Sequence, residues 1–210
     1  MPRLVLATRN PGKIVELRAI LAEALGRHAP GLDVERDVVG VDAYDLPDVV
    51  ESGVTFAENA LLKARFVAER TGLPAVADDS GLAVDVLGGA PGVFSARWAG
   101  RHGDDEANLR LLLAQLSDVP DVHRGAAFVC AAALVTPQGE EHVEHGRLVG
   151  TLERAPRGDG GFGYDPVLTP LGYRRTCAEL DPAEKNAISH RGQAFRALAP
   201  HVARALGVVV

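Results

Sequence analysis

The chain has 210 residues, of which 47% are hydrophobic and 24% charged, and its formal net charge is −6. These values are ordinary for a globular protein that is large enough to bury a core. A negative net charge argues against a nucleic-acid polymer as the partner, because such a partner needs a broad basic face, but it leaves room for a single nucleotide. We find no signal peptide, no membrane span and no metal-binding spacing of Cys130 and Cys177, so we expect a cytoplasmic protein without a membrane partner.

The first part of the chain alternates strand, helix and loop. The apolar run 3–7 predicts a buried strand, and apolar residues at helical spacing from Ile14 to Leu25 predict a helix after it. Residues 33–41 predict a second strand, and the acidic, proline-broken stretch 42–53 predicts a loop.

A capping-box pattern opens the next predicted helix. Thr55 can cap the first turn while the Glu58 side chain returns to the backbone of the cap. The helix should run to about Thr71, because Gly72 and Pro74 follow it.

The rest of the chain continues the alternation of strands and helices. Residues 75–77 predict a short strand that ends in an acidic turn. The remaining predicted elements are a helix over 105–116, strands over 126–135 and 140–149, glycine-rich loops over 88–92 and 157–163, a helix capped by Asp181 and a last helix over 193–206. We therefore expect one α/β domain over residues 1–210.

The turn between the first predicted strand and helix holds candidate phosphate ligands. Such a junction points backbone N–H groups and the positive end of the helix dipole at an anion. Lys13 adds a full charge, and Gly12 lets the backbone approach closely. The pattern is not a Walker A loop, and a plain turn with a helix cap is the alternative. The candidates are Thr8, Arg9, Asn10, Pro11, Gly12 and Lys13.

Two adjacent carboxylates, Asp78 and Asp79, follow the predicted strand 75–77. Buried carboxylates need a counter-charge, and Mg²⁺ is a natural one because it takes oxygen ligands and shares them with substrate phosphates. A carboxylate there can also accept the proton of an attacking water. Neighbours on a strand face opposite sides, so we expect different roles for the two. An exposed acidic turn is the alternative.

Two further charged residues are candidates, one in the loop before the second predicted helix and one within that helix. The capping box accounts for Glu58, whereas Glu51 has no such structural role and is the better candidate for a metal ligand. Lys63 is a candidate for a phosphate contact, with a solvated helix lysine as the alternative.

The second half of the chain offers groups that suit a nucleobase. Glycines around Phe162 allow its ring to lie against a flat ligand, and Asp165 can accept from a ring N–H. A loop with a core aromatic is the alternative. Lys185, His190 and Arg191 gather between two predicted helices and offer donors for carbonyl or phosphate oxygens.

Taken together, these segments resemble the inosine triphosphate pyrophosphatase family, also described as the non-canonical purine NTP (dITP/XTP) pyrophosphatases. The similarity runs nearly from end to end, and the order of the segments makes it specific. The matching segments are Leu6-Ala7-Thr8-x-Asn10-x-x-Lys13, Thr55-Phe56-x-Glu58-Asn59-Ala60-x-x-Lys63-Ala64, Ala77-Asp78-Asp79-Ser80-Gly81-Leu82, Gly88-Gly89-Ala90-Pro91-Gly92-Val93-x-Ser95-Ala96-Arg97, Gly161-Phe162-Gly163-Tyr164-Asp165-Pro166 and Glu184-Lys185-Asn186-x-Ile188-Ser189-His190-Arg191-Gly192.

The resemblance implies a fold and an activity. The expected fold is α/β, with a long twisted mixed sheet, flanking helices and two lobes around a central active-site cleft, usually in a homodimer. The expected activity is the Mg²⁺-dependent hydrolysis of ITP, dITP or XTP to the monophosphate and pyrophosphate, which cleanses the nucleotide pool.

The resemblance also implies roles for the candidate residues. Asp79 looks like the proton acceptor and, with Glu51, like a Mg²⁺ ligand. The turn 8–13 and Lys63 would bind the triphosphate, and Ser80 would contact the substrate. The base would be held by Phe162, Gly163, Tyr164, Asp165, Lys185, His190 and Arg191.

Two features depart from the family pattern, and two alternative functions stay open. Arg9 stands where a smaller residue is often found, and residues 27–31 resemble a local extension. A nucleotide-binding module without catalysis would have no need for the paired carboxylates. A pyrophosphatase for modified pyrimidine or other nucleotides would share the chemistry and differ in its base pocket.

Overall fold

The structure is a computed structural model that describes residues 2–26 and 32–207. The predicted extension at 27–31 lies outside the described residues. The chain divides into two compact units. Unit 1 comprises Met1–Asp79, Cys130–Gly146 and Arg191–Val210, and unit 2 comprises Ser80–Val129 and Arg147–His190.

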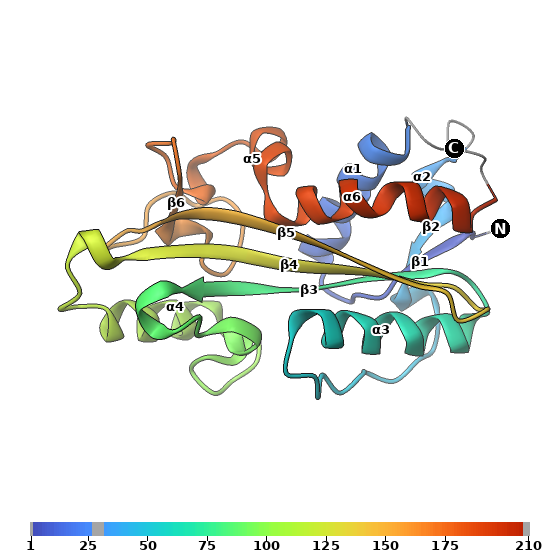
Figure 1. Ribbon diagram of the computed structural model, residues 1–210, viewed down its shortest axis with the longest axis horizontal. Helices are drawn as coiled ribbons and strands as arrows, with labels where there is room; N and C mark the ends of the chain where they lie inside the picture. The colour runs from blue at the N-terminus through green and yellow to red at the C-terminus, as the bar shows by residue number, and fades with distance from the viewer. Residues whose placement is uncertain (1, 27–31, 208–210) are drawn as a thin grey trace. The chain divides into compact units, whose positions relative to one another are not determined.

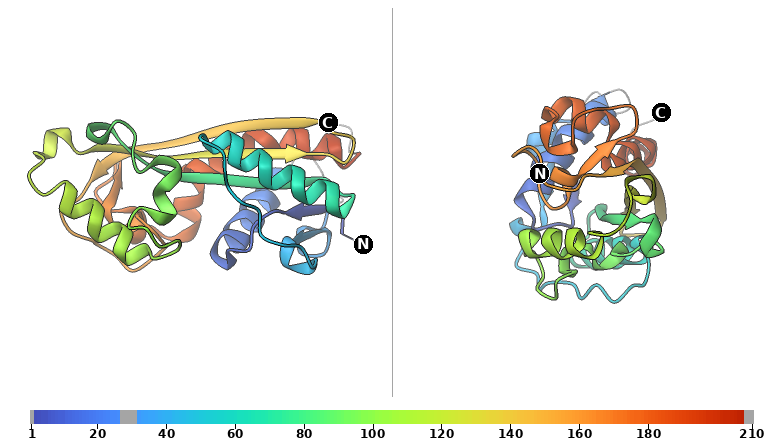
Figure 2. Two further views of the ribbon diagram at one scale, coloured as in Figure 1. Left: turned by 90° about the horizontal axis from the view of Figure 1, so that it is seen from below. Right: turned by 90° about the vertical axis from the view of Figure 1, so that its left-hand side faces the viewer.

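In the described part of the chain, six strands form one mixed sheet in the order β2-β1-β3-β4-β5-β6 (Figure 1). β1 is parallel to β2 and to β3, whereas β5 and β6 are antiparallel. β4 and β5 are neighbours joined by a tight turn (Figure 2). The strands are β1 (Leu4–Leu6), β2 (Val38–Gly40), β3 (Ala75–Val84), β4 (Gly125–Val135), β5 (Glu141–Leu152) and β6 (Leu168–Pro170).

The helices flank this sheet, so the predicted mixed sheet with flanking helices is confirmed. The predicted cleft between two lobes stays a prediction, as does the single domain over residues 1–210. The helices are α1 (Pro11–Gly26), α2 (Val34–Asp37), α3 (Phe56–Thr71), α4 (Asp105–Gln115), α5 (Pro182–Ile188) and α6 (His190–Ala205). Among residues 2–26 and 32–207, none of the helices has the length and apolar character needed to cross a membrane.

Unit 1 buries an apolar core on each face of its part of the sheet. On one face, α1 and α6 pack against Leu4 and Val76. On the other face, α3 packs against Val5, Ala75 and Ala77. Figure 1 shows α1 and α6 on one side of the strands and α3 on the other. This two-sided burial follows from the period of two along a strand, and it explains why β1 is apolar at every position.

Unit 2 has a core of its own. Leu112 of α4 packs in a cluster with Leu82 and Val84 of β3 and with Phe128 of β4. Tyr164 belongs to the same cluster. The second half of β3 therefore has a different set of neighbours from its first half.

The predicted strand over 33–41 is wrong in its first half. Residues 34–37 form the short helix α2, because the Asp33 side chain accepts a hydrogen bond from the Arg36 backbone N–H and caps a helical turn. Only 38–40 form the strand β2.

Two other element boundaries differ from the predicted ones, and both differences change the elements in which candidate site residues lie. β3 continues to Val84 instead of ending at Ala77, so Asp78 and Asp79 lie inside a strand and not in a turn. Lys185 lies inside α5, and α6 begins at His190 and contains Arg191, so these three residues lie within two helices instead of between them. The capping box of α3 and the end of that helix at Thr71 are confirmed.

Candidate active site

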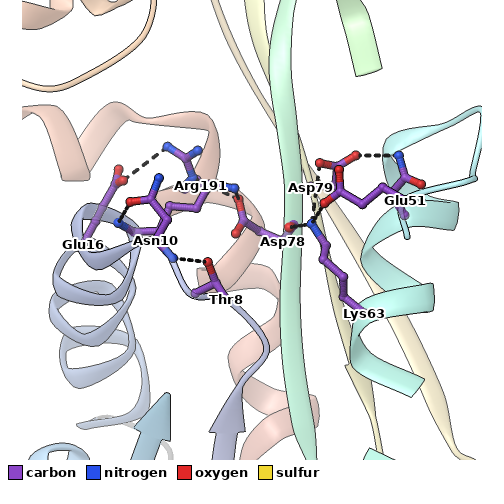
Figure 3. Close-up of polar contacts among 10 residues, drawn as sticks. Thr8, Asn10, Glu16, Glu51, Lys63, Asp78, Asp79 and Arg191 are labelled. Atoms are coloured by element: carbon purple, nitrogen blue, oxygen red, sulfur yellow. Dashed lines mark hydrogen bonds and ion pairs between the residues drawn. The ribbon is translucent and has the colours of Figure 1, made fainter. Parts of the chain in front are cut away.

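Asp78 and Asp79 point to opposite faces of β3, as their adjacency predicts. The alternation along β3 puts Asp78 on the same face as Val76, which packs with α1 and α6. Asp79 follows Ala75 and Ala77 on the face that α3 covers. Figure 3 shows the two carboxylates on either side of the strand, each among its own polar partners.

Asp78 is fully buried and is held by two cations. Its Oδ2 accepts hydrogen bonds from Lys13 Nζ and from Arg191 Nε, each at 3.0 Å. Burial alone would raise the pKa of Asp78, but the charges of Lys13 and Arg191 outweigh it and hold the pKa well below its ordinary value. Asp78 is therefore an ionised structural partner of these two cations and a poor proton acceptor.

Arg191 connects this carboxylate to α1. Its NH1 donates to Glu16 Oε2 at 3.2 Å, and its side chain is only 6% exposed. Burial lowers the pKa of Arg191, but the charges of Asp78 and Glu16 raise it by more. Part of the guanidinium predicted to bind the substrate is thus engaged with two carboxylates.

The predicted phosphate turn has the geometry of a helix N-terminus. Asn10 caps α1, because its Oδ1 accepts from the Lys13 backbone N–H at 3.1 Å, and its own N–H donates to Thr8 Oγ1 at 3.3 Å. Pro11 and Gly12 are the first two residues of the helix. Pro11 has no N–H and the Lys13 N–H is taken by Asn10, so the donors of this turn that suit an anion are the Gly12 N–H and the Lys13 ammonium.

Arg9 ties this turn to the acidic loop that precedes α3. Its Nε forms an ion pair with Asp48 Oδ1 at 2.9 Å, and its NH2 donates to the Leu46 carbonyl oxygen. Asp48 is largely exposed, so the ion pair contributes little to stability.

Asp79 has a different set of partners, all on the face of α3. Asn59 Nδ2 donates to Asp79 Oδ2 at 3.1 Å, and Lys63 Nζ lies 3.6 Å from Asp79 Oδ1. Lys63 also donates to Glu51 Oε1 at 2.8 Å and to the Asp78 carbonyl oxygen at 2.7 Å. The structure thus brings Glu51, Lys63 and Asp79 together, as Figure 3 shows.

The surroundings of Asp79 shift its pKa in the direction opposite to that of Asp78. Burial raises the pKa of Asp79 above its ordinary value; the Lys63 charge opposes this rise, and the Glu51 charge adds to it. Burial acts to lower the pKa of Lys63, but the charges of Asp79 and Asp78 outweigh it and raise that pKa. Asp79 therefore binds a proton more readily than Asp78, and Lys63 is a cation at neutral pH.

The oxygens around Lys63 suit a hard divalent cation. Carboxylate oxygens of Glu51 and Asp79 and the carbonyl oxygen of Asp78 already surround one positive charge, the Lys63 ammonium. Within the described residues, no group of three or more His, Cys, Asp or Glu side chains is arranged to hold a metal. Two carboxylates completed by water and substrate phosphates form the usual environment of Mg²⁺, so the residues fit this ion.

In unit 2, Asp165 organises the segment around Phe162. Its Oδ2 accepts from the Phe162 backbone N–H at 2.8 Å and from Lys185 Nζ at 2.7 Å. The same ammonium lies 5.3 Å from the centre of the Phe162 ring. Gly161 has a φ of +73°, and a Cβ there would meet Asp165 Oδ2 at 2.1 Å, so only glycine fits.

Other predicted residues of unit 2 lie in more structural surroundings. Tyr164 is buried in the core, and its hydroxyl donates to the Ser95 carbonyl oxygen at 3.0 Å. The His190 ring stacks on Phe128 at 5.0 Å between ring centres. Ser80 is half-buried in β3. The Gly163 N–H donates to Asp105 Oδ2 at 3.0 Å, which joins this segment to the start of α4.

Three polar partners of these residues escaped the sequence analysis, namely Glu16, Asn59 and Asp105. A signal existed for two of them. Glu16 follows Lys13 by three residues, and Asn59 precedes Lys63 by four, so each pair shares a helix face. Asp105 approaches Gly163 only through the tertiary fold, so no local pattern indicates it.

Known proteins resemble this chain over nearly its whole length. The profile of the Ham1 family matches residues 4–201. A dITP/XTP pyrophosphatase of Streptomyces coelicolor is 68% identical over 208 residues, which cover 99% of this chain and 100% of that protein. A HAM1 protein structure from Coxiella burnetii matches with a TM-score of 0.83 and 41% identity, over 97% of this chain and 100% of that one. A nucleoside-triphosphatase, or dITP/XTP pyrophosphatase, structure from Mycobacterium abscessus matches with a TM-score of 0.74 and 53% identity, over 94% and 99% of the two chains.

Proposed function

Because this chain belongs to the Ham1 family, we propose that it is a nucleoside-triphosphate pyrophosphatase that hydrolyses dITP, ITP and XTP to the monophosphate and pyrophosphate. The observation that carries this proposal is the pair of neighbouring carboxylates in β3. Asp78 is held ionised between Lys13 and Arg191, whereas Asp79 lies with Glu51 and Lys63 in surroundings that raise its pKa. A binding module without catalysis has no use for such a pair.

The triphosphate is assigned to the turn 8–13 and to Lys63. The Gly12 N–H at the start of α1 and the Lys13 ammonium attract phosphate oxygens. Asp78 holds Lys13 in place, because a buried carboxylate fixes the position of an ammonium that would otherwise be mobile. Arg9 is a further cation at this turn, and its pairing with Asp48 links phosphate binding to the loop that bears Glu51.

Glu51 and Asp79 would hold Mg²⁺, and Asp79 would accept the proton of the attacking water. The metal, when bound, neutralises phosphate charge and makes water a better nucleophile. Asp79 is suited to the proton because its pKa is raised toward the range in which a general base works best. Asn59 keeps one oxygen of Asp79 in place, so the other can face the reaction.

The base is assigned to the Phe162 segment, with Lys185 and His190. The Lys185 ammonium lies over the Phe162 ring and is held by Asp165. This arrangement presents a positive charge and an aromatic face to the base together. We assign a contact with the substrate, or a supporting role for this segment, to Ser80, Gly163 and Tyr164.

The donors offered to the base account for a preference for 6-oxo purines. Hypoxanthine and xanthine carry an acceptor at C6, whereas adenine carries an amino donor. A donor from Lys185 or Arg191 at that position would therefore face another donor in ATP, and such mismatches can discriminate by orders of magnitude. The contacts of Arg191 with Asp78 and Glu16 limit what its guanidinium could offer to a base.

The test is the product pair formed from ITP in the presence of Mg²⁺. IMP with pyrophosphate supports the proposal, and chelation of the metal by EDTA should abolish the reaction until Mg²⁺ is restored. IDP with phosphate, or no product, would contradict it. A panel of ITP, XTP, dITP, GTP, ATP and modified pyrimidine triphosphates separates this activity from that of a related pyrophosphatase with another base.

We further propose that the enzyme works in the cytoplasm as a homodimer and removes abnormal purine nucleotides before polymerases incorporate them. The family resemblance supports this role. Deleting the gene should raise the inosine content of DNA and RNA, measured by mass spectrometry of nucleosides, and an unchanged content would contradict it.

A further inference from the structure

The Lys63 ammonium lies among the oxygens assigned to the metal. It contacts Glu51 Oε1 at 2.8 Å and the Asp78 carbonyl oxygen at 2.7 Å, and it lies 3.6 Å from Asp79 Oδ1. The Lys63 side chain is 14% exposed, so these contacts are largely shielded from water. The protein itself therefore supplies a cation where two carboxylates converge.

A divalent cation and the ammonium compete for these oxygens. Two like charges only a few ångströms apart repel strongly in partly buried surroundings. A metal that binds Glu51 and Asp79 must therefore displace Lys63 from at least one of them. Conversely, Lys63 removes much of the repulsion between the two carboxylates while no metal is bound.

We propose that Lys63 is the counter-cation of Glu51 and Asp79 while no metal is bound, and that it releases these two carboxylates to the divalent metal when nucleotide binds. The proposal rests on the proposed function, since the metal and the triphosphate come from it. It differs from a simple phosphate contact, because Lys63 then competes with the metal for the carboxylates as long as nucleotide is absent.

The triphosphate gives the displaced ammonium a new partner. An ammonium that leaves Glu51 and Asp79 needs another anion nearby, and a phosphate oxygen supplies one. Metal and nucleotide then bind with positive coupling, because each removes an obstacle to the other. Metal alone should bind weakly, because it faces the ammonium and has only two protein carboxylates.

The variant Lys63→Met tests this competition without any turnover. Direct Mn²⁺ binding is followed by the electron paramagnetic resonance of the free ion, in the absence of nucleotide. We expect Lys63→Met to bind Mn²⁺ about tenfold or more tightly than the wild type, because a nearby like charge is removed. The same variant should hydrolyse ITP more slowly, so tighter metal binding accompanies lower activity.

Two control variants separate competition from a general effect of charge. Arg65→Met removes a positive charge from α3 two residues after Lys63. Arg65 pairs with Glu141, and its side chain is 45% exposed. It should leave Mn²⁺ affinity within about threefold of the wild type, because exposed pairs have weak effects. Lys63→Arg keeps the charge and should bind Mn²⁺ as weakly as the wild type.

Nuclear magnetic resonance of the wild type tests the same point without depending on how a variant folds. The sequence contains three lysines, Lys13, Lys63 and Lys185, so lysine labelled with ¹³C and ¹⁵N gives three side-chain signals. The Lys63 signal, assigned with Lys63→Arg, should change little with Mg²⁺ alone and strongly with Mg²⁺ plus a non-hydrolysable ITP analogue.

The outcomes distinguish this inference from the proposed function. Unchanged or weaker Mn²⁺ binding in Lys63→Met, or no binding in either protein, overturns the inference, and so does a Lys63 signal that ignores metal and nucleotide together. Those results would leave the release of pyrophosphate from ITP intact. Absence of pyrophosphate would instead overturn the proposed function, whatever the metal affinities are.

Discussion

At the scale of single residues, adjacent side chains of one strand have opposite electrostatic surroundings. Asp78 is paired with Lys13 and Arg191, whereas Asp79 lies near Glu51, with Lys63 and Asn59 as its partners. The same substitution, Asp to Asn, should therefore have different consequences at the two positions.

Asp79→Asn should lower turnover and leave the fold intact. We expect kcat for ITP to fall by about 10²-fold or more, as is typical when a general base is removed. The thermal midpoint should stay close to that of the wild type, because burial already disfavours the Asp79 charge. Near-normal kcat at saturating Mg²⁺ would contradict the role of Asp79.

Asp78→Asn should instead destabilise the fold. Removing this carboxylate leaves Lys13 and Arg191 without their shared partner, and breaking a buried ion pair costs about 3–5 kcal/mol. Urea denaturation measures this loss, with Asp48→Asn as the control, because the Asp48 side chain is 86% exposed. Equal losses in the two variants would show that the Asp78 cluster does not stabilise the protein.

The contribution of Asp78 to stability should depend on pH in one direction. Its pKa is lowered on folding, so the stabilisation is fully present above the unfolded pKa of about 4 and is lost as pH falls through the lower folded pKa. The difference in unfolding free energy between the wild type and Asp78→Asn should be constant from neutral pH down to about pH 5 and shrink below about pH 4. A difference that instead shrinks as pH rises above neutrality would contradict this assignment.

At the scale of elements, α4 anchors the segment assigned to the base. Asp105, in the first turn of α4, accepts from the Gly163 N–H, whereas its neighbour Asp104 caps the helix by accepting from the Ala107 N–H. Two adjacent carboxylates thus hold different elements, and their variants form a matched pair.

Asp105→Ala should raise KM for ITP with little change in thermal stability. We expect a rise of about 3- to 10-fold, from the loss of a charge-assisted hydrogen bond that is exposed to water. Asp104→Ala should instead leave KM unchanged and lower the free energy of unfolding by about 1 kcal/mol, the usual cost of a lost helix cap. Steady-state kinetics and denaturation on both variants test the pair, and an unchanged KM in Asp105→Ala would show that α4 does not position the base segment.

At the scale of the whole molecule, much of the architecture follows from local patterns. The capping box at Thr55 and the helical spacing of apolar residues after Ile14 predict helices that the structure contains. The alternation of faces along β3 also predicts that Asp78 and Asp79 separate, and their partners lie on opposite faces.

The errors arise where tertiary contacts or caps override local preference. Asp and Gly disfavour strands, yet β3 continues through Asp79 and Gly81. Buried cations compensate Asp78, and a Cβ on Gly81 would lie 2.4 Å from Ser95 Oγ, so close packing requires glycine there. Local preference does not indicate the start of α6 at His190, because glycine disfavours a helix interior, yet α6 contains Gly192.

The proposed homodimer makes a prediction for the assembled protein. Sedimentation at micromolar concentration should give a species of twice the 22.1 kDa of one chain. A single species of the monomer mass over the same range would contradict the proposal.

The opposite faces of Asp78 and Asp79 also limit how this gene can change in length. A one-residue insertion or deletion between Ala75 and Asp78 would exchange even and odd positions of β3, so each carboxylate would point to the opposite face of the sheet, away from its own partners. A two-residue change would keep the parity. A library of single-codon and double-codon insertions tests this limit. Activity should survive insertions in the preceding turn, near Gly72, far more often than one-residue insertions inside the strand.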